Sequence, residues 1–170
     1  YKGLAKNTAQ LYTLFGLAVH GAGVGAQTHV HGEGHLDVAI DGGALALELR
    51  LPLEVVVGFE RPPRDDRQRQ ALNDGLRALE QAHRLFTPSA AAQCQLRAAT
   101  VGEPSWDDAG HGDVQAHYSY TCAQPAALRH LETAALFERF KRLHRLHVQR
   151  IGPQGQAAAR LTRAQPVLRW

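Results

Sequence analysis

The sequence predicts an α+β fold, mainly an antiparallel sheet with one long helix and one short helix. Several short stretches alternate apolar and polar residues, as strands with one buried face do. One longer stretch, residues 65–86, changes to the helical period. Turn signals rich in glycine, proline and aspartate separate these stretches, which favours short strands joined by tight connections.

The first predicted element is a β-hairpin. Residues 35–41 and 44–51 alternate apolar and polar side chains around Asp41-Gly42-Gly43, a sequence typical of tight hairpin turns. Three consecutive valines at 55–57 predict a further short buried strand. The Pro62-Pro63 pair then interrupts regular structure.

The long helix is predicted from Asp65 or Asp66 to about Phe86, and the remaining elements follow it. Its apolar stripe falls at steps of four and three, at Leu72, Leu76, Leu79, His83 and Phe86. Alternation and turn signals then predict strands at 93–101 and 113–121, a short helix at 134–143, and a hairpin with strands 146–151 and 157–162.

The N-terminus has the pattern of a secretory signal peptide. Lys2 and Lys6 precede an apolar run at 11–19, and small residues continue to Ala26. We therefore expect a signal peptide at 1–26, a single domain at 27–170 and a periplasmic location, with no membrane attachment after cleavage. The alternative is an N-terminal helix that belongs to the core.

The charge balance does not indicate nucleic acid as a partner. The formal net charge of the 170 residues is +3. Removing Lys2 and Lys6 from the 19 Lys and Arg leaves 17 against 16 Asp and Glu, a charge of +1. Arginine is scattered, and no basic recognition pattern accompanies it.

The two cysteines, Cys94 and Cys122, predict a disulfide. An exported chain with an even pair enters an oxidising compartment, and both cysteines lie in alternating segments that would form adjacent strands. The alternative is two thiolate metal ligands, although no close Cys-x-x-Cys spacing supports it.

The histidines carry the predicted chemistry. His29 and His31 would point to the same side of an extended segment and could bind one ion. His35, His111 and His117 could complete a site with nitrogen and oxygen ligands. Such ligands suit Zn²⁺ and would also bind Cu²⁺ or Ni²⁺. The alternatives are that His29 and His31 belong to a flexible N-terminus and that the other histidines are solvated surface residues.

The motifs of the common enzyme classes are absent from the sequence. It contains no Gly-x-Ser-x-Gly elbow and no phosphate-binding Gly-x-x-x-x-Gly-Lys loop. The spacing of the histidines also fails the His-x-His-x-Asp-His pattern of binuclear metallohydrolases. We therefore expect a binding protein and not an enzyme.

In a series of short segments, the sequence resembles the ZrgA-like family of zinc-regulated periplasmic proteins. The matching segments lie in order along the chain from about His29 to Trp170, and they are His29-Val30-His31-Gly32, Ala39-Ile40-Asp41-Gly42, Leu51-Pro52, Val57-Gly58-Phe59-Glu60, Cys94, the segment from His111 to Cys122 with Tyr118, Leu136-Phe137, Val148-Gln149 and Gly155-Gln156.

The resemblance implies a periplasmic zinc-binding accessory that assists a zinc ATP-binding-cassette importer, whose periplasmic binding protein would be a partner. Two departures matter. Arg61 stands where the family usually has histidine, and a guanidinium cannot ligate a metal. The His/Asp-rich insert of the family has shrunk to Asp107, Asp108, His111 and Asp113, so zinc capacity or affinity would be reduced.

The resulting site prediction is reversible capture of Zn²⁺ by His29 and His31, completed by His111, His117, Glu60 or His35. The alternative from another class is a periplasmic structural or interaction module with incidental histidines. Cleavage after Ala26 would also create the terminus Gln27-Thr28-His29. Its amine, backbone amides and imidazole could bind Cu²⁺ or Ni²⁺ in a square plane.

Overall fold

The computed structural model describes residues 31–170. The predicted signal peptide, His29 and the predicted copper site at Gln27-Thr28-His29 lie outside the described residues. No helix in the described part of the chain is both long and apolar enough to cross a membrane.

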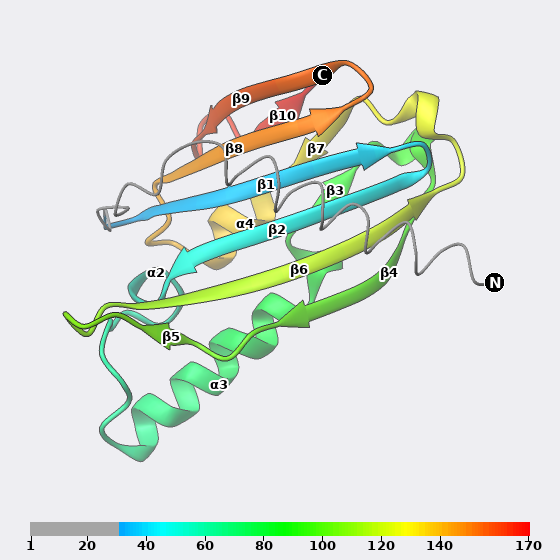
Figure 1. Cartoon of the computed structure of the whole chain (residues 1–170). Coiled ribbons are helices and arrows are strands. Elements are labelled where there is room, and N and C mark those ends of the chain that lie inside the picture. The colour runs from blue at the N-terminus through cyan, green and yellow to red at the C-terminus, as the bar shows by residue number, and fades with distance from the viewer. Residues whose placement is uncertain (1–30) are drawn as a thin grey trace.

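A large, mostly antiparallel sheet forms the body of the protein (Figure 1). Its strand order is β4-β6-β2-β1-β8-β9, with the short β5 paired to β6. The α+β prediction is confirmed. The strands of this sheet are β1 (Glu33–Asp41), β2 (Ala44–Pro52), β4 (Cys94–Val101), β5 (Ser105–Trp106), β6 (Gly112–Cys122), β8 (Arg145–Gly152) and β9 (Gly155–Leu161).

Both predicted hairpins are confirmed. The β1–β2 pair is antiparallel, and Asp41 lies opposite Ala44 next to the predicted turn. The β8–β9 pair is also antiparallel and closes between Gly152 and Gly155. The sequence did not predict that β8 pairs in parallel with β1, which places the C-terminal hairpin beside the N-terminal one.

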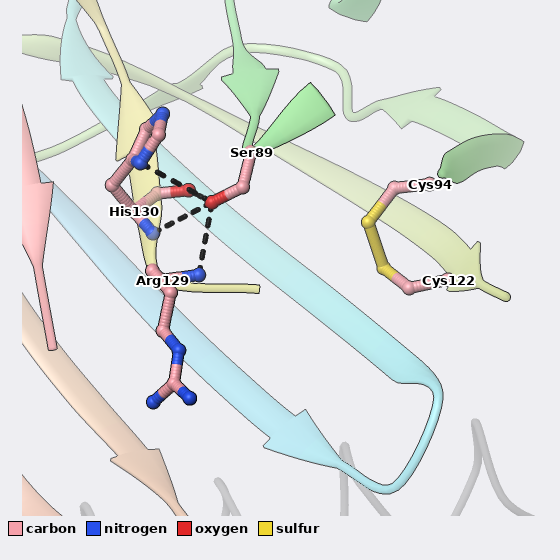
Figure 2. Close-up of a disulfide and its surroundings, with 5 residues drawn as sticks. All are labelled: Ser89, Cys94, Cys122, Arg129 and His130. Atoms are coloured by element: carbon pink, nitrogen blue, oxygen red, sulfur yellow. Dashed lines mark hydrogen bonds between the residues drawn. A yellow bond between two sulfur atoms is a disulfide. The ribbon is translucent and has the colours of Figure 1, made fainter. Parts of the chain in front are cut away.

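The predicted disulfide is confirmed, and a bulge interrupts the alternation of β4. Cys94 and Cys122 lie opposite each other on β4 and β6 and form a disulfide (Figure 2). A bulge between Leu96 and Ala98 shifts the alternation of β4. Leu96, which precedes the bulge, is 36% exposed on this edge strand. Beyond the bulge, Ala99 packs against the core instead of Ala98.

The three valines at 55–57 form a helix and not the predicted strand. The short helix α2 (Leu53–Val57) begins directly after Pro52. Proline is well tolerated next to the first turn of a helix because its fixed φ suits that turn. Leu53 and Val55 are buried, so packing against the core outweighs the strand preference of β-branched residues.

The long helix is confirmed but ends earlier than predicted. Helix α3 (Asp66–Glu80) begins with a cap in which Asp65 Oδ1 accepts from Gln68 N at 2.8 Å. A short 3₁₀ turn, η1 (Ala82–Arg84), follows it, so His83 is exposed and lies off the apolar stripe. The second predicted helix, α4 (Ala134–Arg139), is also shorter than expected.

The core lies between the large sheet and a layer of helices and short strands. Figure 1 shows α3, α4 and a small sheet on one side of the large sheet. The small sheet has the order β10-β7-β3, and its strands are β3 (Thr87–Pro88), β7 (His130–Glu132) and β10 (Val167–Arg169). Tyr118 of β6 is fully buried there, and its hydroxyl donates to Leu79 O of α3 at 2.9 Å.

Candidate metal centre

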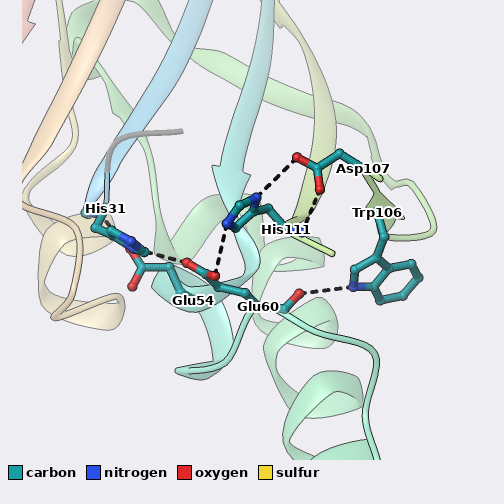
Figure 3. Close-up of polar contacts among 7 residues, drawn as sticks. His31, Glu54, Glu60, Trp106, Asp107 and His111 are labelled. Carbon is teal, nitrogen blue, oxygen red and sulfur yellow. Dashed lines mark hydrogen bonds and ion pairs between the residues drawn. The ribbon is translucent and has the colours of Figure 1, made fainter. Parts of the chain in front are cut away.

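Four chain segments meet where β1 begins and β2 ends. They bring together four side chains that we call the loop cluster: His31, Glu54, Glu60 and His111 (Figure 3). His31 lies in the turn before β1, Glu54 in α2, Glu60 in the segment after α2, and His111 before β6. Three of them, His31, Glu54 and Glu60, offer ligand atoms within 4.8 Å of one another.

Glu54 is held by the turn that precedes β1. Its Oε1 accepts from Gly32 N at 2.7 Å and lies 3.4 Å from His31 Nδ1. Gly32 has φ +75°, and a Cβ there would meet Arg142 O at 2.9 Å and His144 Cδ2 at 2.5 Å. A residue without a Cβ is therefore required for the chain to turn His31 toward Glu54.

Glu60 is fixed through its backbone. Trp106 Nε1 donates to Glu60 O at 3.1 Å. A Cβ at Gly112 would lie 2.8 Å from the same oxygen, so the start of β6 packs directly against this carbonyl. These contacts hold the segment after α2 against the β5–β6 hairpin.

His111 is oriented by Asp107 across a tight turn. Asp107 Oδ1 accepts from His111 N at 2.8 Å, and Asp107 Oδ2 lies 3.3 Å from His111 Nδ1. A carboxylate at Nδ1 favours the proton on that nitrogen, which leaves the lone pair on Nε2. His111 Nε2 faces Glu60 Oε2 at 3.6 Å.

The Glu60 carboxylate therefore lies between two imidazoles, because its other oxygen, Oε1, is 3.1 Å from His31 Nδ1. Ligand atoms in a tetrahedral zinc site are about 3.3 Å apart, as bonds of about 2.0 Å require. The His31 to Glu54 and His31 to Glu60 distances, 3.4 and 3.1 Å, are close to this value. The arrangement is chemically suited to a small divalent cation.

The cluster is accessible from solvent on the histidine side. The His31 side chain is 73% exposed, whereas Glu54 and Glu60 are 20% and 30% exposed. An ion could therefore reach the carboxylates past the exposed imidazole without any opening of the fold.

The other histidines of the predicted site lie elsewhere. His35 and His117 are on the outer face of the large sheet, which we define as the face opposite the helices. Their polar neighbours on this face include Glu33, Asp37, Glu48, Arg50, Gln115 and His147. His117 is five residues along β6 from Gly112, roughly 17 Å from the loop cluster. The structure thus brings His31, Glu60 and His111 together and separates His35 and His117 from them.

Side chains on the outer face form pairs between neighbouring strands. The rings of His35 and His147 stack with centroids 5.2 Å apart, and His147 Nε2 lies 2.7 Å from Glu33 Oε2. Burial, with the nearby His147, lowers the pKa of His35. Burial, with the charge of Glu48 opposite, raises the pKa of Asp37 to about 6.

Sequence reasoning missed Glu54 as a member of the cluster and Asp107 and Trp106 as its supports. Glu54 was missed because the valines that follow it predicted a strand. The pattern Pro52, an acidic residue in the next turn, and Gly58 six residues after the proline indicates a short helix with its acidic residue near the N-terminus. No comparable signal marks Trp106, whose contact with Glu60 spans 46 residues.

Comparison with known proteins gives one result. A family model described as ZrgA family zinc uptake protein matches residues 28–170. A search of curated proteins finds no match to the chain.

Proposed function

Because the chain belongs to the ZrgA family of zinc uptake proteins, we propose that it captures Zn²⁺ reversibly at the loop cluster. The proposed role is to bind and pass on an ion, without catalysis. Zinc is the cargo of the protein in this account.

The observation that carries the proposal is the position of Glu60 between two imidazoles. His31, Glu54 and Glu60 converge on one point, and His111 lies against the other oxygen of the Glu60 carboxylate. Nitrogen and carboxylate oxygen ligands are those that zinc prefers in sites without cysteine. The only two cysteines of the chain are joined in the disulfide, so they are not available as ligands.

His31, Glu54 and Glu60 are the proposed primary ligands, and His111 completes the set with Asp107 as its orienting partner. His29 precedes His31 by two residues and is a further proposed ligand from the sequence pattern. The same donors would accept Cu²⁺ or Ni²⁺, because affinity alone does not separate these ions. The zinc uptake family is the reason to assign zinc.

Exposure of the site supports reversible binding and transfer. The His31 side chain is the most exposed member of the cluster, so an incoming ligand could displace it first. The proposed recipient is the periplasmic binding protein of a zinc ATP-binding-cassette importer. A periplasmic location is supported by the disulfide, which requires an oxidising compartment, and by the signal-peptide pattern of residues 1–26.

The test is a competition titration of the purified protein with a chromogenic zinc chelator. Glu60→Gln keeps the shape of the side chain and removes its charge, so it should weaken zinc binding about a hundredfold, as loss of a primary ligand does. Glu48→Gln on the outer face is the matched control, and its affinity should stay within about twofold of wild type.

Failure of the wild-type protein to bind zinc at micromolar concentration would contradict the proposal. The loop cluster would then be a group of ion pairs, and the protein a structural or interaction module with incidental histidines. Equal loss of affinity in both variants would also contradict it, because the cluster would not be the specific site.

A further inference from the structure

A second candidate site lies at the far end of β1 from the loop cluster. It is a cavity of about 280 Å³, large enough for a small organic molecule. Its walls come from the end of β1 at Ile40, the β8–β9 turn, the segment before β7, and Trp170. Strand β1 spans roughly 25 Å, so this cavity is separate from the proposed zinc site.

A buried arginine lines the cavity. Arg150 is only 7% exposed, because alternation along β8 places it on the core side with Leu146 and Val148. Its Nε and Nη1 atoms are buried without a hydrogen-bond partner among residues 31–170. No acidic side chain in that range forms an ion pair with it. A guanidinium stays charged, and burying it without an anion is unfavourable.

A second arginine and an indole complete the site. Arg129 also lines the cavity, and its backbone is fixed because Ser89 Oγ accepts from Arg129 N and from His130 N, both at 2.9 Å (Figure 2). The Trp170 ring centroid lies 5.9 Å from Arg150 Cζ, and Trp170 N donates to Arg129 O at 3.1 Å. Trp170 therefore contacts both arginines, Arg150 through its ring and Arg129 through a backbone hydrogen bond.

We infer that this cavity binds a small organic carboxylate with a short apolar tail. The planar fork of a guanidinium matches the two oxygens of a carboxylate. The anion would supply the partner that Arg150 Nε and Nη1 lack. Ile40, Leu128 and Trp170 offer apolar surface for the tail, which a fully hydrated inorganic anion would leave unused.

The test is isothermal titration calorimetry of the zinc-free protein with hexanoate, 1-hexanol and inorganic phosphate. Hexanoate should bind one-to-one with a Kd of about 1 mM or tighter. The uncharged 1-hexanol and the tailless phosphate should each bind at least about tenfold more weakly, because each lacks one half of the recognition. Failure of hexanoate to saturate, or phosphate binding as tightly as hexanoate, would overturn the inference.

Two variants assign the binding to the arginines. Arg150→Met keeps an unbranched side chain and should remove the preference for hexanoate over 1-hexanol, while zinc affinity stays unchanged. Arg129→Gln alters an exposed residue and should reduce the same preference about threefold, which tests the site even if Arg150→Met does not fold. An unchanged preference in Arg129→Gln and in a folded Arg150→Met would overturn the assignment.

Discussion

The loop cluster and the outer face of the sheet both combine histidines with carboxylates. Only in the loop cluster do side chains from different segments converge on one carboxylate. In the loop cluster, His31 and His111 each face an oxygen of the same carboxylate. On the outer face, His147 pairs with Glu33 and His117 lies 3.8 Å from Glu48. Both regions contain histidines and carboxylates, but their geometry differs.

The difference follows from how the backbone presents each residue. Neighbouring strands are about 4.8 Å apart and side chains on one face recur about every 7 Å along a strand, so a sheet face spreads its side chains over a grid. Such a grid favours cross-strand pairs. The ends of strands and helices can approach one point from several directions, as the segments around Glu60 do.

Removing the disulfide should have the largest effect on stability and none on the zinc site. Cys94→Ser with Cys122→Ser opens a loop of 28 residues and should lower the free energy of unfolding by about 3 to 4 kcal/mol. Cys122 is at the opposite end of β6 from the loop cluster. Zinc affinity of the folded variant should therefore match wild type, as measured by denaturant unfolding and chelator competition.

Changed zinc affinity in the folded serine variant would show that the cluster depends on the far end of the sheet. The two regions would then not be independent.

Gly32→Ala should disturb the loop cluster through its turn. Left-handed backbone costs a residue with a Cβ about 1 to 2 kcal/mol, and the close contacts of this Cβ with Arg142 O and His144 Cδ2 add to it. We expect a total loss of about 3 kcal/mol in unfolding free energy and at least a tenfold loss of zinc affinity.

The matched control is Gly42→Ala in the β1–β2 turn. Gly42 also has a positive φ, +52°, but a Cβ there would meet nothing within 4 Å. Gly42→Ala should lower the free energy of unfolding by about 1 kcal/mol and leave zinc affinity unchanged. Equal effects of the two substitutions would show that backbone strain, and not the close approach at Gly32, is what matters.

Asp107→Asn should weaken zinc binding about tenfold, because the orienting contact with His111 Nδ1 is lost. Asp108→Asn changes the neighbouring exposed carboxylate and should change the affinity by less than twofold. Calorimetric titration of both variants with zinc separates orientation of His111 from the general negative charge of the loop. Similar losses in both would favour the general charge.

Asp37→Asn should stabilise the protein at neutral pH, in contrast to the loss of function expected at Glu60. Burial raises the pKa of Asp37 from 3.8 to about 6, so the folded state favours the protonated carboxyl. The stability from this preference is complete below about pH 4 and is lost as the pH rises through 6. The shift corresponds to at most about 3 kcal/mol, and screening by solvent reduces the expected gain to about 1 kcal/mol.

The measurement is denaturant unfolding of both proteins at pH 4 and pH 7.5. Asp37→Asn should be more stable than wild type at pH 7.5 and equal to it at pH 4. A gain that is the same at both pH values would contradict the assigned cause.

Local sequence signals predicted the local elements of this fold. The Asp41-Gly42-Gly43 turn and the alternation around it were sufficient for the β1–β2 hairpin, and the alternation of 113–121 was sufficient for β6. The parallel pairing of β1 with β8 was not predictable, because it joins segments about 110 residues apart through tertiary packing. The strands of the small sheet have two or three residues, too few for a periodicity to appear.

Residues of the candidate site were predictable only where they lie within a recognisable short sequence motif. The histidine next to Gly32 and the family resemblance around Gly58-Phe59-Glu60 pointed to two members. Glu54 required recognition of a one-turn helix, which three valines concealed. The sequence alone could not show which of His111 and His117 joins the cluster. The answer depends on which end of β6 lies at the cluster, and the alternation of the strand does not indicate that.

The most direct test of the central claim is anomalous scattering at the zinc edge from crystals grown with one equivalent of zinc. We expect one strong peak within about 2.0 to 2.2 Å of His31 Nδ1 and a Glu60 oxygen, and no peak on the outer face. A peak between His35 and His147, or no bound zinc at all, would contradict the account.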